Sequence, residues 1–259
     1  MARRRGSVRI GTSGYVYEHW WGAFYPEDIP ARARFAHYAE RFDTVEVNNT
    51  FYRLPSEKVV RDWADAAPPG FLYAFKASRY VTHMKRLLPG GTYGSPVETL
   101  LDRLAPLGDK LGPVLFQLPP QMPKDAERLR AFLQRIPYRE EVPYVFEFRH
   151  ASWYDDEVLG LLGEHGVAFC IHDWVHAPAP IEVTSDVVYV RFHGHRAPYQ
   201  DLYGPRRLAP WVKRIREWQR QGRDVYAYFN NDQAAYAVRD ARWLGEKLGV
   251  AKEAPLLAA

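Results

Sequence analysis

The 259-residue chain is poor in cysteine and has no long apolar run. Its one cysteine, Cys170, cannot form an internal disulfide and lies within the apolar stretch 167–171, where a buried and inert thiol is expected. Uninterrupted apolar runs reach only five residues, as at 71–75, whereas a helix that spans a membrane needs about 20. A disulfide-stapled scaffold and a transmembrane protein are therefore excluded.

The first residues also lack the features of a secretory signal. They read Met-Ala-Arg-Arg-Arg-Gly and lead into a strand-like stretch, with neither an apolar segment nor a small-residue cleavage site. We expect a cytoplasmic protein with no membrane partner. We also expect a single domain over residues 1–259, with 1–7 as a basic N-terminal tail and 250–259 as a C-terminal tail. The sequence leaves the oligomeric state open.

Charge of neither sign dominates the composition. Lys and Arg total 35 against 31 Asp and Glu, which gives a net charge of +4 and a pI near 9.0. This mild basic excess permits an anionic partner without requiring one. With 47% apolar and 25% charged residues, the composition is that of an ordinary globular protein.

Short runs rich in Val, Ile, Phe and Tyr recur along the chain and predict strands. There are eight of them, at residues 8–14, 44–52, 71–78, 113–118, 143–149, 167–173, 187–194 and 224–231. Between them apolar residues recur with helical spacing, as at Val59, Val60 and Trp63 after the capping residue Ser56. The connection 174–186 reads instead as a loop.

Strands that alternate with helices predict parallel strands joined by right-handed crossovers. Eight such strands in about 250 residues predict an α/β protein with a single (β/α)8 TIM-type barrel. An open doubly wound sheet is the alternative. It is disfavoured because Gly-Thr-Ser-Gly at 11–14 lacks the third glycine of a dinucleotide fingerprint, and no Gly-x-x-x-x-Gly-Lys phosphate loop occurs.

A dense set of local motifs carries a family resemblance. The motifs are Gly-Thr-Ser-Gly at 11–14, Trp20 with Gly22, Phe-Tyr-Pro at 24–26, Thr-Val-Glu-Val-Asn-Asn-Thr-Phe-Tyr-Arg-Leu-Pro at 44–55, Phe-Lys at 75–76, Thr-His at 82–83, Arg-Leu at 86–87, Leu-Gly-Pro at 111–113, Phe-Gln-Leu-Pro-Pro at 116–120, Glu-Phe-Arg at 147–149, Ser-Trp at 152–153, Tyr-Val-Arg-Phe-His-Gly at 189–194 and Phe-Asn-Asn at 229–231. Over nearly its whole length the chain thus resembles the YecE-like family, also called domain of unknown function 72. The resemblance implies a (β/α)8 barrel and leaves its chemistry unassigned. Tyr15 is a departure, because the family more often has tryptophan there.

Inward-facing polar residues late in each strand are the candidates for a site, because barrel enzymes place their active sites at the carboxyl ends of the strands. Alternation sorts the two faces, so Val45 and Val47 should face the helices while Glu46 faces the barrel. The same rule gives an inward set of Glu46, Asn48, Lys76, Gln117, Glu147, Arg149, Tyr189, Arg191, His193 and Asn230. In the sixth strand the pattern cannot decide between His172 and Asp173.

The charges of this set predict an anionic ligand. Three permanent cations, Lys76, Arg149 and Arg191, face Glu46 and Glu147, which leaves a positive excess. Aromatic residues in the loops after the strands could stack on a sugar or a base. These loop aromatics are Tyr15, Trp20, Trp21, Tyr52, Trp153, Trp174, Tyr199 and Tyr203. The expected substrate-binding residues are Ser13, Tyr15, Asn48, Tyr52, Lys76, Gln117, Arg149, Trp153, Asp173, Arg191 and Asn230.

We therefore predict an enzyme that acts on a phosphate-containing ligand, namely a phosphosugar, a nucleotide or nucleic acid. Glu46 or Glu147 would act as general base and His193 as acid or base, in chemistry of hydrolase or isomerase/lyase type. The sequence requires no cofactor. A divalent metal is a lesser alternative, with Glu46, Glu147, His172, Asp173 and His193 as weak candidate ligands, since no His-Glu-x-x-His or Cys-x-x-Cys motif occurs.

Two other functions remain as alternatives. Glu46 and Glu147 could form the carboxylate pair of a glycoside hydrolase, although neighbouring arginines would lower the pKa of the general acid. A non-catalytic nucleic-acid-binding protein could use the basic tail at Arg3, Arg4 and Arg5 together with the basic helix 206–220. In that helix the basic residues alternate with apolar core positions, so a solvated outer face is the favoured interpretation.

Overall fold

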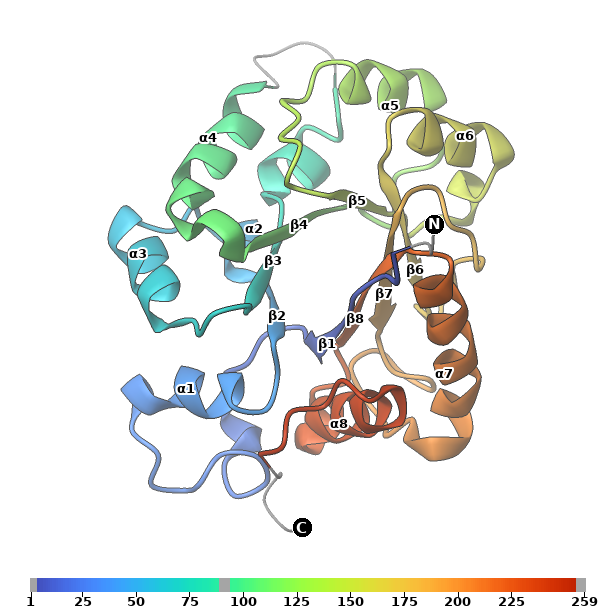
Figure 1. Cartoon of the computed structure of the whole chain (residues 1–259). Coiled ribbons are helices and arrows are strands. Elements are labelled where there is room, and N and C mark those ends of the chain that lie inside the picture. The colour runs from blue at the N-terminus through green and yellow to red at the C-terminus, as the bar shows by residue number, and fades with distance from the viewer. Residues whose placement is uncertain (1–3, 89–93, 255–259) are drawn as a thin grey trace.

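Eight parallel strands form a nearly closed barrel in the computed structural model, which describes residues 4–88 and 94–254 (Figure 1). Each strand pairs with its neighbours in the order β1-β8-β7-β6-β5-β4-β3-β2, and the backbone bridge between Ser13 and Glu46 joins the two ends. The predicted (β/α)8 barrel is confirmed. The strands are β1 (Val8–Thr12), β2 (Thr44–Val47), β3 (Leu72–Lys76), β4 (Leu111–Gln117), β5 (Tyr144–Glu147), β6 (Ala168–His172), β7 (Val187–Phe192) and β8 (Asp224–Phe229).

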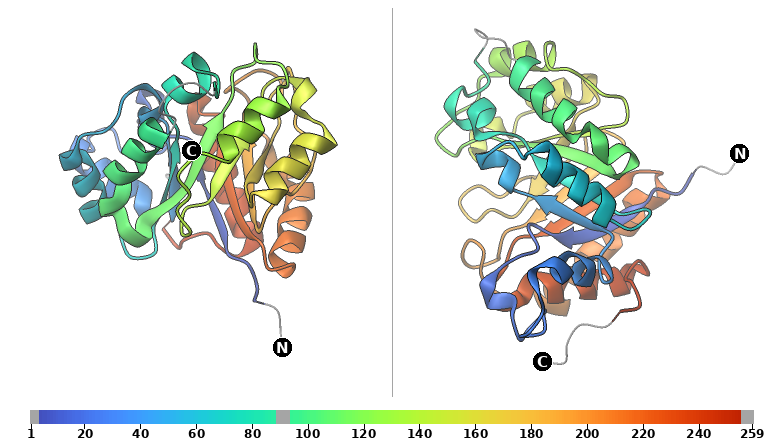
Figure 2. Two further views of the ribbon diagram at one scale, coloured as in Figure 1. Left: turned by 90° about the horizontal axis from the view of Figure 1, so that it is seen from above. Right: turned by 90° about the vertical axis from the view of Figure 1, so that its left-hand side faces the viewer.

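Helices surround the barrel, with α7 and α8 across the barrel from α3 and α4 (Figures 1 and 2). The α-helices are α1 (Arg34–Ala39), α2 (Asn49–Tyr52), α3 (Glu57–Ala66), α4 (Gly94–Leu104), α5 (Ala126–Leu133), α6 (Asp156–Glu164), α7 (Gly204–Arg220) and α8 (Tyr236–Leu248). Short helical turns add η1 (Glu18–Trp20), η2 (Ala31–Ala33), η3 (Tyr80–Met84), η4 (Ala105–Lys110), η5 (Ala151–Trp153) and η6 (Gln233–Ala235). As expected, 174–186 between β6 and β7 contains no helix. None of the helices in the described ranges has the length and apolar character to cross a membrane.

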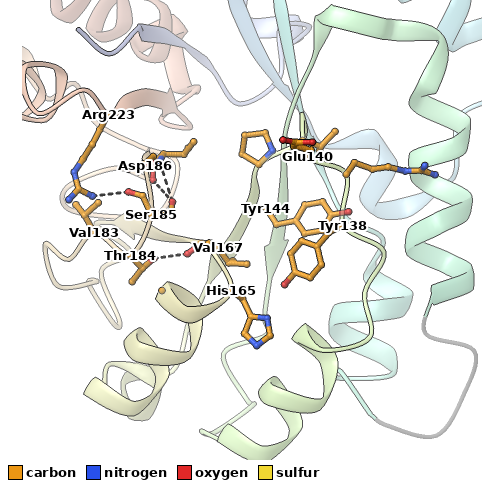
Figure 3. A pocket seen from close by; sticks show the side chains of 16 residues that line it. Tyr138, Glu140, Tyr144, His165, Val167, Val183, Thr184, Ser185, Asp186 and Arg223 are labelled. Carbon is orange, nitrogen blue, oxygen red and sulfur yellow. Dashed lines mark hydrogen bonds between the residues drawn. The ribbon is translucent and has the colours of Figure 1, made fainter. Parts of the chain in front are cut away.

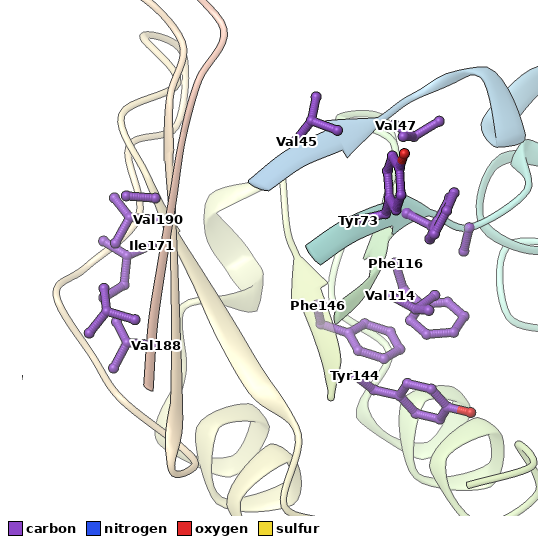
Figure 4. Packing of buried hydrophobic residues seen from close by; sticks show 14 of the residues in the cluster. Val45, Val47, Tyr73, Val114, Phe116, Tyr144, Phe146, Ile171, Val188 and Val190 are labelled. Carbon is purple, nitrogen blue, oxygen red and sulfur yellow. The ribbon is translucent and has the colours of Figure 1, made fainter. Parts of the chain in front are cut away.

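The two faces of the strands carry different side chains, as alternation predicts. Outward residues such as Val45, Phe146 and Val190 pack against the helices in one extensive apolar core (Figure 4). Inward residues form a separate cluster inside the barrel, made of Ala74, Leu115, Val145, Ala168, Cys170, Tyr189, Tyr226 and Tyr228. Cys170 is fully buried within this inner cluster, and burial raises the pKa of its thiol well above the usual value, so the expected inert cysteine fits its surroundings.

The predicted strand 44–52 is in fact a strand followed by a helix. Strand β2 ends at Val47, because Asn48 adopts helical backbone angles (φ −95°, ψ −12°) and starts α2. The hydroxyl of Thr50 then donates to the carbonyl of Lys76 (2.7 Å), which ties this short helix to the end of β3. The prediction was wrong here because β-branched and aromatic residues continue past the point where the backbone turns.

Both chain ends expected as tails contact the barrel where the structure describes them. Arg4 forms an ion pair with Asp224 (2.7 Å), and the backbone amide of Ser7 donates to the same carboxylate. At the other end, Lys252 Nζ donates to the carbonyl of Ala39 (2.6 Å). Residues 1–3, including Arg3 of the expected basic tail, and residues 255–259 lie outside the described ranges.

The seam between β1 and β2 depends on Tyr38 and Gly11. The Tyr38 hydroxyl accepts from the backbone amide of Thr12 (3.0 Å) and donates to the carbonyl of Thr44 (3.0 Å), so a side chain replaces strand pairing. A Cβ on Gly11 would lie 2.2 Å from the Thr44 carbonyl oxygen, so only glycine permits the close approach of the two strands. Closure of the barrel at this seam therefore depends on the hydrogen bonds of the Tyr38 side chain.

Replacing Tyr38 by Phe should destabilise the fold. The substitution leaves a buried amide and a buried carbonyl without their partner, which costs about 2 kcal/mol. Urea denaturation measures the loss. Tyr73→Phe is the matched control, because its hydroxyl makes one partly buried bond to the Trp63 carbonyl (3.0 Å) and its loss should cost about 1 kcal/mol. Equal stability of Tyr38→Phe and the unaltered protein would contradict this account of the seam.

Candidate functional site at the carboxyl ends of the strands

The inside of the barrel is layered along its axis. On β3 to β8 the next inward side chain lies two residues beyond the apolar inner cluster, and at this level the side chains are polar. This polar layer comprises Lys76, Gln117, Glu147, His172, Arg191 and Asn230, two positions after Ala74, Leu115, Val145, Cys170, Tyr189 and Tyr228 respectively. The candidate site is therefore a polar layer of side chains that lies directly next to the apolar cluster inside the barrel.

Arg191 joins opposite walls of this layer. Its Nη2 donates to Glu46 Oε1 (2.7 Å) and its Nη1 donates to Glu147 Oε2 (2.6 Å), so one guanidinium lies between carboxylates from β2 and β5. Glu46 also accepts from the hydroxyls of Ser13 (2.5 Å) and Tyr189 (2.6 Å). Both glutamates are 0% exposed and Arg191 is 2% exposed. Both oxygens of Glu46 are thus hydrogen-bonded, whereas the buried Nε of Arg191 has no hydrogen-bond partner in the described residues.

Arg149 holds the second oxygen of Glu147. Its Nε donates to Glu147 Oε1, and its guanidinium lies 4.2 Å from the ring centre of Trp174. Burial by itself would raise the pKa of Glu147, but Arg149 and Arg191 outweigh it and hold this pKa well below its usual range. Glu147 is ionised at neutral pH and has no proton to donate.

His193 is a neutral imidazole in this network. Burial, reinforced by Arg149 and Arg191, lowers the pKa of His193 well below its usual value. Arg149 Nη2 lies 2.9 Å from His193 Nε2, and an arginine can only donate, so the ring proton is assigned to Nδ1. The atom 3.2 Å from Nδ1 is Asn230 Nδ2, itself a donor, so this tautomer requires the Asn230 amide to be turned with its oxygen toward the ring. Proton transfer at Nε2 would require Arg149 to move away.

Lys76 is the cation of the mouth without a carboxylate partner. Within residues 4–88 and 94–254, no acceptor lies at hydrogen-bond or ion-pair distance from its Nζ, which lies 4.2 Å from the centre of the Phe51 ring. Burial, together with the charge of Arg191, lowers the pKa of Lys76 to about 8. Its side chain is half-buried.

A cavity of about 380 Å³ opens over these groups. Of its described lining residues three are cations and one is a carboxylate, Asp232, which pairs with His19 (3.3 Å). Glu46 and Glu147 do not line the cavity. The cavity wall therefore exposes cationic side chains, whereas the glutamates that balance their charge lie beneath it. The lining comprises Tyr17, Asn48, Phe51, Tyr52, Lys76, Gln117, Arg149, Arg191, Tyr199, Asn230 and Asp232.

Most of the residues predicted to bind substrate meet at this cavity. Asn48, Tyr52, Lys76, Gln117, Arg149, Arg191 and Asn230 line it, and Ser13 lies beneath it against Glu46. Trp153 does not line the cavity: it is fully buried among outward-facing residues, stacked on Phe148, with its Nε1 donating to the carbonyl of Met122 (2.7 Å). Tyr15 also lies off the cavity, packed edge to face against Phe35.

The structure decides between His172 and Asp173. His172 shares the inward face with Cys170, and its Nε2 lies 2.7 Å from the carbonyl oxygen of Phe148. Asp173, predicted to bind substrate at the mouth, accepts from the backbone amide of His193 (2.7 Å) and from the Tyr203 hydroxyl. Burial raises the pKa of Asp173 to about 6. Neither residue lines the cavity.

Tyr17, Phe51 and Asp232 line the cavity and were missed from the sequence. Each follows the end of a strand by a few residues, after β1, β2 and β8 respectively. Their position shortly after the end of a strand was the feature of the sequence that could have identified them. Phe51 was hidden because the run 44–52 was read as one strand. Of the predicted loop aromatics, Tyr52 and Tyr199 line the cavity.

The weak metal candidates do not gather into a site. Over the described ranges 4–88 and 94–254, no group of three or more His, Cys, Asp or Glu is arranged to hold a metal ion. The Arg191 guanidinium occupies the space between Glu46 and Glu147. The residues present therefore do not fit a divalent metal held by Glu46, Glu147, His172, Asp173 and His193.

A larger cavity, about 580 Å³, lies at the opposite end of the barrel (Figure 3). It is lined by residues that precede strands β5 to β8, among them Tyr138, His165 and Arg223. Its polar groups bond locally: Arg223 donates to the Ser185 carbonyl (2.7 Å) and Thr184 to the Val167 carbonyl (2.6 Å). Because the cations converge at the carboxyl ends, the smaller cavity is the candidate site.

Comparison with known proteins places this architecture in a family. The chain is 24% identical over 282 residues to the UPF0759 protein YunF of Bacillus subtilis, covering 94% of this chain and 95% of that protein. A crystal structure of a DUF72 family protein from Thermotoga maritima is 28% identical, with a TM-score of 0.83, covering 94% of this chain and 99% of that one. One from Enterococcus faecalis is 21% identical, with a TM-score of 0.79, covering 97% and 100%. The family model described as "Protein of unknown function DUF72" matches residues 9–259, and the chain therefore belongs to the DUF72 family.

Proposed function

We propose that the mouth of the barrel binds the anionic group of a small phosphate-containing substrate of an enzyme. The observation that carries this proposal is the separation of charge: Lys76, Arg149 and Arg191 line the cavity, whereas Glu46 and Glu147 lie beneath it. Two donor groups remain available there. Lys76 Nζ and Arg149 Nη1 have no hydrogen-bond partner within the described part of the chain. An oxyanion would accept from both.

The walls of the cavity suit the remainder of such a ligand. Tyr52 is 72% exposed and Tyr199 44% exposed, so their rings are open to stack on a sugar or a base. Asn48, Gln117 and Asn230 supply amides that can bond hydroxyl groups. A volume of several hundred Å³ accommodates a ligand the size of a phosphosugar or a mononucleotide.

The buried glutamates act in this proposal as anchors for the arginines. Each carboxylate oxygen of Glu46 and Glu147 accepts at least one charged or hydroxyl donor. A general base needs an unoccupied lone pair within reach of the substrate, and neither glutamate lines the cavity. The role of general base predicted for them is accordingly replaced here by that of positioning residues.

The two alternative functions find less support. A glycoside hydrolase needs space for a sugar between its two carboxylates, and Arg191 fills the space between Glu46 and Glu147. For nucleic-acid binding along the outer helix, Arg216 donates to the Lys247 carbonyl and Arg220 pairs with Glu217. These two basic side chains are therefore already engaged in contacts within the protein.

Sulfate should stabilise the protein by binding at the mouth. At about ten times its Kd, a ligand specific for the folded state raises the melting temperature of a domain of this size by about 3–6 °C. Lys76→Met and Arg149→Met should each reduce this shift. Thermal melts in sulfate measure it, with Arg214→Met on the outer face of α7 as the matched control that keeps the full shift.

The rise in melting temperature caused by sulfate should become smaller as the pH rises and as salt is added. Sulfate keeps its charge between pH 7 and 9, while Lys76, with a pKa of about 8, loses its own, so the stabilisation should weaken across this range. Added sodium chloride should weaken it as well. Stabilisation by neutral oligosaccharides without any response to sulfate, phosphate or a nucleotide would overturn the proposal.

Glu147→Gln should lower the free energy of unfolding. The substitution leaves two buried guanidinium groups with a single carboxylate, a loss of about 3–5 kcal/mol measurable by urea denaturation. Because the pKa of Glu147 is depressed in the folded state, its contribution is present above about pH 4.3 and is lost as pH falls through the folded value. Glu157→Gln, which breaks an exposed pair with Lys124, is the control and should cost under about 1 kcal/mol. Equal losses in the two variants would contradict the anchoring role.

A further inference from the structure

Lys76 differs from the two arginines of the mouth in its surroundings. Arg149 and Arg191 each donate to a buried glutamate, and these two positive charges balance Glu46 and Glu147. No carboxylate in the described ranges lies within ion-pair distance of Lys76 Nζ. Lys76 is therefore not needed to neutralise the buried network, and its amine faces a cavity.

The surroundings of Lys76 also favour the neutral amine, which is the form that attacks carbonyl carbon. An amine becomes nucleophilic when it is desolvated or lies near another cation. Both conditions hold here: burial in the barrel mouth desolvates Lys76, and Lys76 shares the cavity wall with Arg149 and Arg191. The resulting pKa of about 8 leaves about a tenth of the amine free at pH 7, far more than in an ordinary lysine.

We propose that Lys76 forms an imine with the carbonyl group of a small anionic substrate, whose anionic group is held by Arg149. This inference rests on the anion site proposed above and adds a covalent step to it. The substrate class is a carbonyl compound that bears a carboxylate or a phosphate, such as a 2-oxo acid or a phosphorylated aldehyde or ketone. Both have the same requirement, an anionic group a few atoms from an electrophilic carbon.

The chemistry of this step balances without a cofactor. The lone pair of Nζ forms a bond to the carbonyl carbon, the C=O π electrons move to oxygen, and a proton passes from the nitrogen to that oxygen to give a carbinolamine. Loss of the hydroxyl group as water, together with the remaining N–H proton, leaves the C=N bond of the imine. Protonation of the imine nitrogen gives an iminium, which withdraws electrons from the adjacent bonds.

Residues around Lys76 suit these intermediates. The Phe51 ring, 4.2 Å from Nζ, can stabilise an iminium through the same cation–π contact that it offers the ammonium. Side-chain amides of Asn48 and Gln117 line the same cavity and can hydrogen-bond the carbinolamine hydroxyl. The buried Oδ1 of Asn48 has no partner in the described part of the chain.

Reductive trapping tests the proposal on the whole protein. The protein is incubated at pH 8 with sodium cyanoborohydride and one of three probes: glyoxylate, dihydroxyacetone phosphate or the neutral propionaldehyde. Intact mass and peptide mapping then locate the secondary amine. At pH 8 a lysine with a pKa near 8 has about 100-fold more free amine than an ordinary lysine, so Lys76 should be modified well before exposed Lys58. Because an aldehyde and a ketone differ in intrinsic reactivity, each probe is compared by its rate of labelling at Lys76 relative to that at Lys58, and this ratio shows whether glyoxylate or dihydroxyacetone phosphate is preferred.

Controls separate the covalent step from anion binding. Sulfate should slow the labelling of Lys76 by the anionic probes and leave that of Lys58 unchanged. Lys76→Arg keeps the positive charge, so it should retain the sulfate-induced thermal shift and lose one equivalent of label. Peptide mapping of the unaltered protein gives the decisive result whether or not this variant folds.

The possible results point in different directions. Sulfate stabilisation with Lys76 labelled no faster than Lys58 would overturn the imine and leave the anion site in place. Selectivity for Lys76 over Lys58 that is as high with propionaldehyde as with the anionic probes, with no competition from sulfate, would overturn the substrate class together with the anion site. Selective labelling by an anionic probe that sulfate slows supports the whole proposal.

Discussion

The guanidinium of Arg191 is the constraint on which the carboxyl end of the barrel depends. It reaches Glu46 on β2 and Glu147 on β5 from its own position on β7, so three strands that are not neighbours in the sheet are held by one group. Removal of charge from water is costly, and the cost is met here by short hydrogen bonds to every carboxylate oxygen. Because each partner depends on the others, the network behaves as a unit.

This network also determines which charges reach the cavity. The carboxylate oxygens of the glutamates accept hydrogen bonds below the cavity. Arg149, in contrast, retains an available Nη1, and Lys76 has no described counter-ion. The result is a polarised site in which negative charge is buried and positive charge is exposed to a ligand. A mouth with the same residues but with glutamates at its surface would attract metal ions or cationic ligands instead.

Barrel closure and the site share one element. The bridge between Ser13 and Glu46 joins the ends of β1 and β2, and the side chains of the same two residues meet within the charge network. Nearby, Tyr38 links Thr12 to Thr44 where the strands do not pair directly. Stability at the seam and positioning of Glu46 are therefore coupled, and changes at Tyr38 act on both.

The sequence by itself determined the barrel, its eight strands and the inward direction of Glu46, Glu147 and Arg191, because alternation is a local property of a strand. It could not determine that Arg191 lies between the two glutamates, since that contact depends on how distant strands face one another across the closed barrel. The same limit applies to Asp173, which bonds Tyr203 in a loop, and to Trp153, whose burial depends on the packing of Phe148. Lys76 was visible as an inward cation, but only the tertiary structure showed that no carboxylate among residues 4–88 and 94–254 pairs with it, because Glu46 and Glu147 pair with arginine.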